Sequence, residues 1–276
     1  MQFAYLKMQG AGNRIVVVDQ RRKKQAPPSR AELRKLGDER SGPGFDQLMW
    51  VGPAVAASAA ASYRVFNADG SEVEQCGNGV RCVAWMLAQE RGSGRTFVLE
   101  SPAGLIEATV LDDARVTVNM GPPEFAPARI PFLAETQADR YTLDVLGRSL
   151  DVSVLSMGNP HCVLEVADVA TADVAVLGAA IERHERFPAA ANVGFRHIRD
   201  RTSIDLRVHE RGVGETLACG TGACAAVVAG RQLDRLDTEV AVHLPGGRLV
   251  VSWRGDTDPV WLTGDAELIS EGTVDL

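Results

Sequence analysis

Lysine, aromatic residues and long apolar runs are scarce in this chain of 276 residues. Only four lysines occur, so 29 − 4 = 25 of the basic residues are arginine, and the 276 − 35 = 241 residues after Lys35 hold no side-chain amine. A pyridoxal phosphate enzyme with its lysine in either half is therefore disfavoured. Aromatic residues make up 5% of the chain. The longest uncharged apolar stretch, residues 48–63, is too short and too broken by glycine and proline for a membrane-spanning helix.

An excess of positive charge is also missing. The chain carries 29 basic and 36 acidic residues, a net charge of −7, so it lacks the basic surface that binds nucleic acid or anionic membranes. The N-terminus has no basic segment followed by an apolar core, so we expect no secretion signal. Five cysteines, an odd number, favour reduced thiols in a cytoplasmic protein over a disulfide framework.

What is present is typical of a globular protein of about two domains, with 45% hydrophobic and 24% charged residues. The chain also repeats itself. Cys76-Gly77-Asn78-Gly79 recurs as Cys219-Gly220-Thr221-Gly222, an offset of 219 − 76 = 143, and glycines 104 and 121 recur at 247 and 264 with the same offset. Three landmarks in one register indicate a unit used twice.

The proline-containing segment 121–131 is the natural junction between the two copies. We therefore expect an N-terminal half, residues 1–121, that carries Cys76, and a C-terminal half, residues 122–276, that carries Cys219. The tail, about residues 264–276, is a segment that could pack back on the first half.

Each half contains short β-branched segments and one strongly apolar helix. We expect helices at 79–89 and 222–229, just after the cysteine motifs, and peripheral helices at 29–36, capped by Ser29, and at 173–184. The first two are apolar on nearly every face and must be enclosed. The expected fold is α+β, with two pseudo-symmetric barrel-like domains of mostly antiparallel strands, each around a central apolar helix. The predicted strands are 15–19, 63–67, 96–101, 105–111, 115–120, 152–155, 162–166, 204–208, 240–244 and 250–253.

Cys76 and Cys219 stand at the entrances of the two enclosed helices. Free backbone N–H groups and the positive end of the helix dipole converge there, which lowers the pKa of a thiol from about 8.5 and forms an anion site. If the two helix starts face each other, both could hold one carboxylate, with one sulfur on each side of the adjacent carbon. A thiolate would remove a proton from one face and a thiol would deliver a proton to the other. The pattern predicts an amino-acid racemase or epimerase that needs no cofactor.

Other roles for these residue types have less support. Cys82, Cys162 and Cys224 lie in apolar runs and are expected in the core. The cysteine spacings differ from those of zinc sites, so we expect no metal. Of the five histidines only His161, near Asn159, has a predicted role. A noncatalytic protein that captures a carboxylate at its helix starts is the alternative from another class.

A larger set of motifs resembles the diaminopimelate epimerase family, within the group that includes proline racemase. Asn78 favours the diaminopimelate branch, because proline racemases usually have histidine at that position. The matching segments, in chain order, are Lys7-Met8 to Gly12-Asn13, Asp46-Gln47, Phe66 to Ser71, Cys76 to Cys82, Met157 to His161, Asn192-Val193, and Glu210 to Gly212 through Glu215-Thr216 to Gly222.

The resemblance implies interconversion of LL- and meso-2,6-diaminopimelate in lysine and peptidoglycan precursor synthesis, by a cytoplasmic homodimer without metal or organic cofactor. It implies that Cys76 and Cys219 are the proton-transfer thiols, assisted by His161 and Glu210. The backbone N–H groups implied to meet the α-carboxylate are those of Gly77, Asn78, Gly220 and Thr221. The side chains implied to bind the rest of the ligand are Asn13, Gln47, Asn67, Asn159, Asn192, Glu210 and Arg211.

The chain departs from the family pattern after Asn13, where Arg14-Ile15 replace the usual Asp-Phe. A cation at this position changes the charge near the expected ligand. A racemase or epimerase of another amino acid, such as proline or hydroxyproline, is the alternative within the same chemistry. The polar side chains implied for the distal pocket disfavour it, because leaving them unpaired against an apolar ring is costly.

Overall fold

The offset of 143 residues that repeats in the sequence also repeats in the pairing of strands. In the computed structural model, which describes residues 2–23, 25–73 and 76–275, Ala61 pairs with Leu99 and Ile204 pairs with Val242. Both pairs belong to parallel strands, and the second lies 204 − 61 = 143 and 242 − 99 = 143 residues after the first. The duplicated fold expected from the cysteine motifs is therefore confirmed in the strand register.

The chain divides into two units, Met1–Asn119 with Thr263–Leu276, and Met120–Leu262. The sequence placed the junction after residue 121, and the chain changes unit two residues earlier. It returns to the first unit within β17 (Trp261–Gly264). There β18 (Glu267–Asp275) pairs antiparallel with β1 (Gln2–Gly10).

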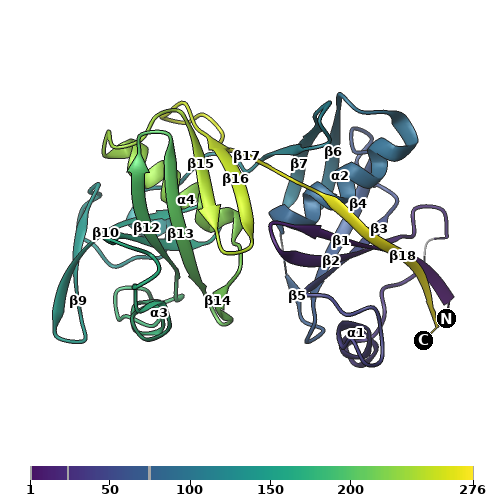
Figure 1. Ribbon diagram of the computed structural model, residues 1–276, viewed down its shortest axis with the longest axis horizontal. Coiled ribbons are helices and arrows are strands. Elements are labelled where there is room, and N and C mark those ends of the chain that lie inside the picture. The colour runs from purple at the N-terminus through teal and green to yellow at the C-terminus, as the bar shows by residue number, and fades with distance from the viewer. Residues whose placement is uncertain (1, 24, 74–75, 276) are drawn as a thin grey trace. The chain divides into compact units, whose positions relative to one another are not determined.

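The first unit encloses helix α2 (Gly77–Arg91), which contacts β1 and five other strands of that unit (Figure 1). The sheet is mostly antiparallel, with parallel pairs β2–β3 and β4–β6. Leu33 and Leu36 of α1 pack on the other face of the sheet, against Phe3 and Trp50. The remaining elements of this unit are β2 (Asn13–Asp19), α1 (Arg30–Gly37), β3 (Gln47–Gly52), β4 (Ala61–Asn67), β5 (Glu72–Val73), β6 (Arg95–Ser101), β7 (Gly104–Val110) and β8 (Val116–Asn119).

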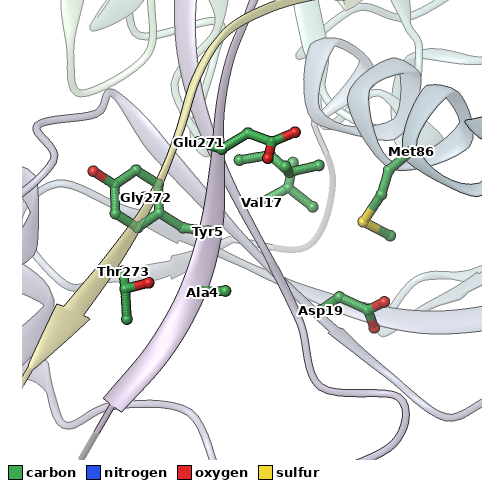
Figure 2. A pocket seen from close by; sticks show the side chains of 9 residues that line it. Ala4, Tyr5, Val17, Asp19, Met86, Glu271, Gly272 and Thr273 are labelled. Atoms are coloured by element: carbon green, nitrogen blue, oxygen red, sulfur yellow. The ribbon is translucent and has the colours of Figure 1, made fainter.

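An open pocket of about 510 Å³ lies on the first unit beside β1, β2 and β18 (Figure 2). Tyr5, Leu6, Val17 and Met86 contribute its larger side chains, and Asp19 and Glu271 contribute its charges. None of its nine lining residues is a predicted site residue.

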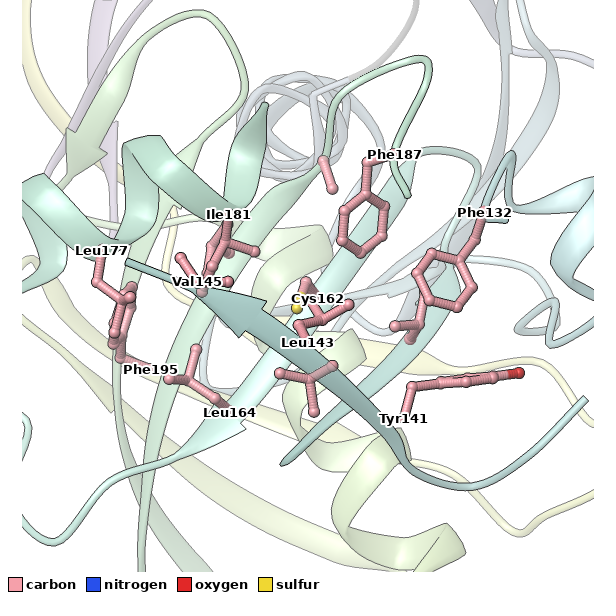
Figure 3. Close-up of a cluster of buried hydrophobic side chains, with 14 of the residues drawn as sticks. Phe132, Tyr141, Leu143, Val145, Cys162, Leu164, Leu177, Ile181, Phe187 and Phe195 are labelled. Atoms are coloured by element: carbon pink, nitrogen blue, oxygen red, sulfur yellow. The ribbon is translucent and has the colours of Figure 1, made fainter. Parts of the chain in front are cut away.

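The second unit repeats this plan around α4 (Gly220–Gln232), whose residues 222–230 are all buried. Parallel pairs β11–β12 and β13–β15 interrupt an otherwise antiparallel sheet. Figure 3 shows the apolar cluster of this unit, in which the ring centroid of Phe132 lies 4.8 Å from that of Tyr141 and 4.9 Å from that of Phe187. The remaining elements are η1 (Pro127–Arg129), β9 (Tyr141–Val145), β10 (Arg148–Ser156), β11 (Pro160–Glu165), α3 (Val174–Glu182), β12 (Asn192–Asp200), β13 (Ser203–Glu210), β14 (Gly214–Thr216), β15 (Glu239–Leu244) and β16 (Gly247–Ser252).

The two enclosed helices and the two peripheral helices lie where the sequence predicts them, with ends that differ by a few residues. The pattern did not reveal the long strands β1, β3, β12 and β18, nor the shorter strands β5, β9, β14 and β17. The middle of β3 is buried on both faces, so its side chains do not alternate between polar and apolar. Most side chains of β18 are exposed, and its pairing with β1 rather than an apolar face makes it a strand. No helix in the described part of the chain is both long enough and apolar enough to cross a membrane.

Ser29 caps α1 as expected and forms a capping box with Glu32. The N–H of Ser29 donates to the Glu32 carboxylate at 2.7 Å, and the N–H of Glu32 donates to the Ser29 hydroxyl at 3.4 Å. We expect Ser29→Ala to lower the free energy of unfolding by about 1 kcal/mol, measured by urea denaturation. Glu32→Gln retains an acceptor at the same place and is expected to cost less. An unchanged midpoint in Ser29→Ala would show that the box adds no stability.

Candidate active site

Cys76 is the N-cap residue of α2, with an extended backbone (φ −145°). Its sulfur accepts a hydrogen bond from the N–H of Gly79 at 3.2 Å. Its thiol lies 2.5 Å from the side-chain oxygen of Gln47 on β3, to which it donates. The half-buried sulfur therefore satisfies one free N–H of the first helical turn and lies at the positive end of the helix dipole.

Two more predicted site residues of the first unit, Gln47 and Asn67, are connected to Cys76 by hydrogen bonds. Gln47 and Asn67 are opposite each other in the β3–β4 pair, and Nε2 of Gln47 donates to Oδ1 of Asn67 at 3.2 Å. Asn67 in turn donates to the hydroxyl of Ser71 at 3.1 Å, a contact that the sequence motif does not reveal. The β3–β4 pair thus holds both amides beside the thiol, and the turn after β4 fixes the Asn67 amide through Ser71.

Unsatisfied acceptors mark the same unit. Oδ1 of Asn13 and Oδ1 of Asn78 are buried and have no hydrogen-bond partner among the described residues. A buried polar atom without a partner is costly, and such atoms are rare in native structures. These two acceptors are therefore suited to the N–H donors of a ligand.

Glycine lets α2 begin close to the sheet. A Cβ at Gly79 would lie 2.2 Å from the sulfur of the buried Met49 on β3, so the Met49 side chain or the helix start would have to shift. The matched position, Gly222, is less tight, with 3.0 Å to a methyl group of Val208 and 3.3 Å to the sulfur of Cys219. The glycines of the motifs let each helix start approach the sheet and the thiol closely.

Cys219 is the N-cap residue of α4 and is only 5% exposed. Burial raises its pKa well above the usual value, and the negative charge of Glu210 raises it further. The hydroxyl of Thr221, 3.6 Å from the sulfur, and the N–H of Gly222 act in the opposite direction. The thiol of Cys219 is therefore protonated at neutral pH, with a carboxylate beside it that can accept its proton.

A chain of hydrogen bonds joins His161 to the first turn of α4. The Nε2 atom of His161 lies 2.9 Å from Oδ1 of Asn159, and Nδ2 of Asn159 donates to the hydroxyl of Thr221 at 3.4 Å. Burial, together with the positive charge of Arg211, lowers the pKa of His161 to about 3. His161 is therefore uncharged at neutral pH and acts through hydrogen bonds rather than through a positive charge.

The predicted residues Asn192, Glu210 and Arg211 are also brought together in the second unit. Oδ1 of Asn192 accepts from the backbone N–H of Arg211 at 3.0 Å. The hydroxyl of Thr216 on β14 donates to Glu210 at 2.5 Å. Thr216 orients the Glu210 carboxylate, a role that the sequence motif did not reveal.

His209 is not the ordinary strand residue that its sequence context suggests. It is 6% exposed and lies 2.9 Å from the carboxylate of Glu182, which is equally buried. The two residues are 27 positions apart, so no local pattern could have linked them.

The cation at Arg14 is compensated. Its guanidinium and its backbone N–H both donate to the carboxylate of Asp46 at 2.8 Å, and the guanidinium also pairs with Glu39. The departure from the family pattern therefore adds no unpaired charge beside Asn13. Asp46 precedes Gln47, so this pair also ties β2 to the start of β3.

The remaining cysteines are buried in the cores. Cys82, Cys162 and Cys224 are all 0% exposed, and burial raises the pKa of Cys82 to about 12. Within residues 2–23, 25–73 and 76–275, no group of three or more histidine, cysteine, aspartate or glutamate side chains could hold a metal ion.

Comparison with protein-family models gives a match to diaminopimelate epimerase over residues 5–126 and 153–269. The chain belongs to the diaminopimelate epimerase family. Relatives of that name include proteins from Laribacter hongkongensis, 51% identical over 280 residues, and Alkalilimnicola ehrlichii, 49% identical over 280 residues. Both alignments cover 100% of this chain and 100% of the relative.

Solved structures with 17–18% sequence identity share the fold of this family. A probable proline racemase from Agrobacterium radiobacter K84 has a TM-score of 0.73, with 99% of this chain and 93% of that chain covered. A hydroxyproline epimerase from Agrobacterium vitis has a TM-score of 0.71, with 99% and 92% covered. The predicted architecture of two barrel-like units is thus confirmed.

The effect of Glu210 on Cys219 can be measured without substrate. We expect Glu210→Gln to lower the pKa of Cys219, because the carboxylate charge that raises it is removed. Alkylation of Cys219 by iodoacetamide, followed by mass spectrometry as a function of pH, should then have a midpoint at lower pH than in the wild-type protein. Glu215→Gln is the matched control, since Glu215 pairs with Arg207. An equal midpoint in Glu210→Gln and wild type would contradict the assignment.

Proposed function

We propose that this protein interconverts LL- and meso-2,6-diaminopimelate by moving a proton between two thiols, Cys76 and Cys219, without metal or organic cofactor. The observation that carries the proposal is the matched placement of the thiols. Each is the N-cap residue of the enclosed helix in its own copy of the repeated unit. Relatives named diaminopimelate epimerase, about half identical over the full chain, support this substrate.

The proposed reaction breaks and remakes one C–H bond. A thiolate takes the α-proton from one face, the electron pair spreads onto the adjacent carboxylate, and the opposite thiol delivers its proton to the other face. In the reverse direction the two sulfurs exchange roles. Because burial and Glu210 keep Cys219 protonated at neutral pH, it is the proposed proton donor in the direction in which Cys76 is the base. Cys76 must first give up the proton that it donates to Gln47.

Fixed dipoles replace a cofactor in this scheme. The N–H groups of Gly77, Asn78, Gly220 and Thr221 at the two helix starts are the proposed partners of the reacting carboxylate. They stabilise the charge that develops in the transition state, since they are already oriented before the reaction begins. Neutral His161 supports this arrangement through Asn159 and Thr221. Glu210 is the proposed acceptor of the Cys219 proton only in the direction in which Cys219 acts as the base.

The polar side chains outside the helix starts fit a substrate with a second charged head. Asn13, Gln47, Asn67, Asn159, Asn192 and Arg211 are the proposed ligands of its ammonium and carboxylate groups, together with Glu210. An apolar proline ring would leave such groups unpaired, at a cost of about 1–3 kcal/mol each.

We also propose that the protein acts as a cytoplasmic homodimer in lysine and peptidoglycan precursor synthesis. The surface beside β18 supports an interface, because Ile269 is 50% exposed there and the pocket beside Tyr5 and Met86 is partly apolar.

The proposed activity can be tested by proton exchange. Incubation with LL-diaminopimelate in heavy water should produce the meso isomer with deuterium at one α-carbon, detected by mass spectrometry. L-proline and trans-4-hydroxy-L-proline, assayed side by side, should take up no deuterium. Exchange with the ring substrates and none with diaminopimelate would favour the alternative epimerase, whereas exchange with none of the three would favour a binding protein.

Removing either proposed proton-transfer thiol should stop turnover. We expect Cys76→Ala and Cys219→Ala each to lower the rate by about 100-fold or more, the usual contribution of a positioned acid or base. Cys162→Ala is the matched control, because this thiol is buried in the core of the second unit and its loss should reduce stability without slowing the reaction. Wild-type turnover in either of the first two variants would exclude the two-thiol scheme.

A further inference from the structure

A buried carboxylate holds the turn that carries Glu210 and Arg211. Glu182, the last residue of α3, is 6% exposed. One of its oxygens accepts a hydrogen bond from the N–H of Gly212 at 2.9 Å, and the other lies 2.9 Å from Nε2 of His209. The Glu182 side chain therefore contacts both His209, directly before the Glu210–Arg211 pair, and Gly212, directly after it.

The backbone of Glu182 extends this support toward other site residues. Its carbonyl accepts from the N–H of Ala191 at 3.2 Å. The next residue, Asn192, accepts from the N–H of Arg211 at 3.0 Å and donates to the carbonyl of Pro160 at 3.1 Å. Pro160 directly precedes His161. Hydrogen bonds thus connect Glu182 to the segments that carry Asn192, Arg211 and His161.

The charge and packing of Glu182 suit this role. Burial raises its pKa, but the N–H of Gly212 and the ring of His209 outweigh burial and hold the pKa below its usual value. The carboxylate is therefore ionised at neutral pH, and His209 donates to it from Nε2. The helix is also closely fitted to this ring, since a Cβ at Gly178 of α3 would lie 2.7 Å from His209.

In the first unit, the turn between β4 and β5 corresponds to the turn between β13 and β14, and α1 corresponds to α3. There too the helix contacts the turn, but with side chains of the opposite charge. Asp69 lies 212 − 69 = 143 residues before Gly212. Its carbonyl accepts hydrogen bonds from Nε of Arg34 and Nε of Arg30 on α1, at 3.0 and 3.3 Å. In the first unit two arginines donate to a backbone carbonyl of the turn, and in the second unit a glutamate accepts from a backbone N–H of the turn. The same helix-to-turn support in both copies indicates that the position of the turn is what the contact maintains.

We propose that Glu182 is a positioning residue of the active site, which holds the turn between β13 and β14 so that Glu210 and Arg211 meet the substrate and Cys219. This inference rests on the proposed function. Glu182 acts through Gly212 and His209, and its loss would free the turn while the thiols and their helices stay in place.

The test compares three variants by steady-state kinetics with LL-diaminopimelate, at a temperature at which circular dichroism shows all of them folded. Glu182→Ala removes both hydrogen bonds and should raise KM by about tenfold or more, with a smaller fall in kcat. Glu182→Gln keeps an acceptor for Gly212. Its amide can donate to Nε2 of His209 once the proton moves to Nδ1, which has no partner in the described part of the chain. We expect it to stay within about threefold of wild type.

Ile181→Ala is the matched control. It removes a fully buried neighbour on the same helix and should lower stability with little change in KM. A KM rise in Ile181→Ala equal to that in Glu182→Ala would overturn the inference, as would a wild-type KM in Glu182→Ala. If Glu182→Ala does not fold, His209→Phe replaces it, because it keeps the ring against Gly178 and removes only the Nε2 bond. An unchanged KM in His209→Phe would then also count against the inference.

Amide hydrogen exchange separates this inference from the proposed function. The N–H groups of Arg211 and Gly212 should exchange about tenfold faster in Glu182→Ala than in wild type, and not in Ile181→Ala. Unchanged exchange at Gly212 would overturn the inference whatever the activity. Faster exchange in a protein that turns over no diaminopimelate would leave the support of the turn in place and reject the proposed substrate.

Discussion

The first turn of an enclosed helix has backbone N–H groups without partners in the helix, and water is not available to pair with them. This constraint determines which groups lie at each helix start. Because α2 and α4 are wrapped by their sheets, their first turns must find acceptors inside the protein. The sulfur of Cys76 is one such acceptor, since it receives the N–H of Gly79. The remaining N–H groups of that first turn lie at the positive end of the helix dipole and are suited to a carboxylate. The proposed anion site and the placement of the proposed reactive thiol therefore follow from one packing requirement.

Duplication supplies two such helix starts, and a single exchange of residue type makes them chemically different. Asn67 and Glu210 occupy equivalent positions, 210 − 67 = 143 residues apart. In the first unit the amide groups of Gln47 and Asn67 lie beside the half-buried Cys76. In the second unit a carboxylate lies beside the buried Cys219 and raises its pKa. An amide at one position and an acid at the other thus give the two thiols different surroundings on the same scaffold, as the division of roles in the proposed reaction needs.

Much of the fold could be predicted because its signals are local. The apolar faces of α2 and α4, the serine cap of α1 and the offset between the cysteine motifs are all visible within short stretches. The strand β3 was missed because burial on both faces removes the alternation that marks a strand. The strand β18 was missed because its partner, β1, lies at the other end of the chain. Among the site residues, the motifs named Gln47 and Asn67, but their hydrogen bond to each other depends on strand register, which no single segment contains.

The sequence by itself determined that there are two copies of one unit, that each copy encloses a helix, and that a cysteine stands at each helix start. Spacing and residue type are enough for these conclusions, because they depend on the periodicity of the chain. Only the tertiary structure decided which groups surround each sulfur, that His161 is buried and uncharged, and that Glu182 holds the turn behind Glu210 and Arg211. These properties arise from burial and from contacts between residues far apart in the chain, so they exist only once the strands have paired and the helices are enclosed.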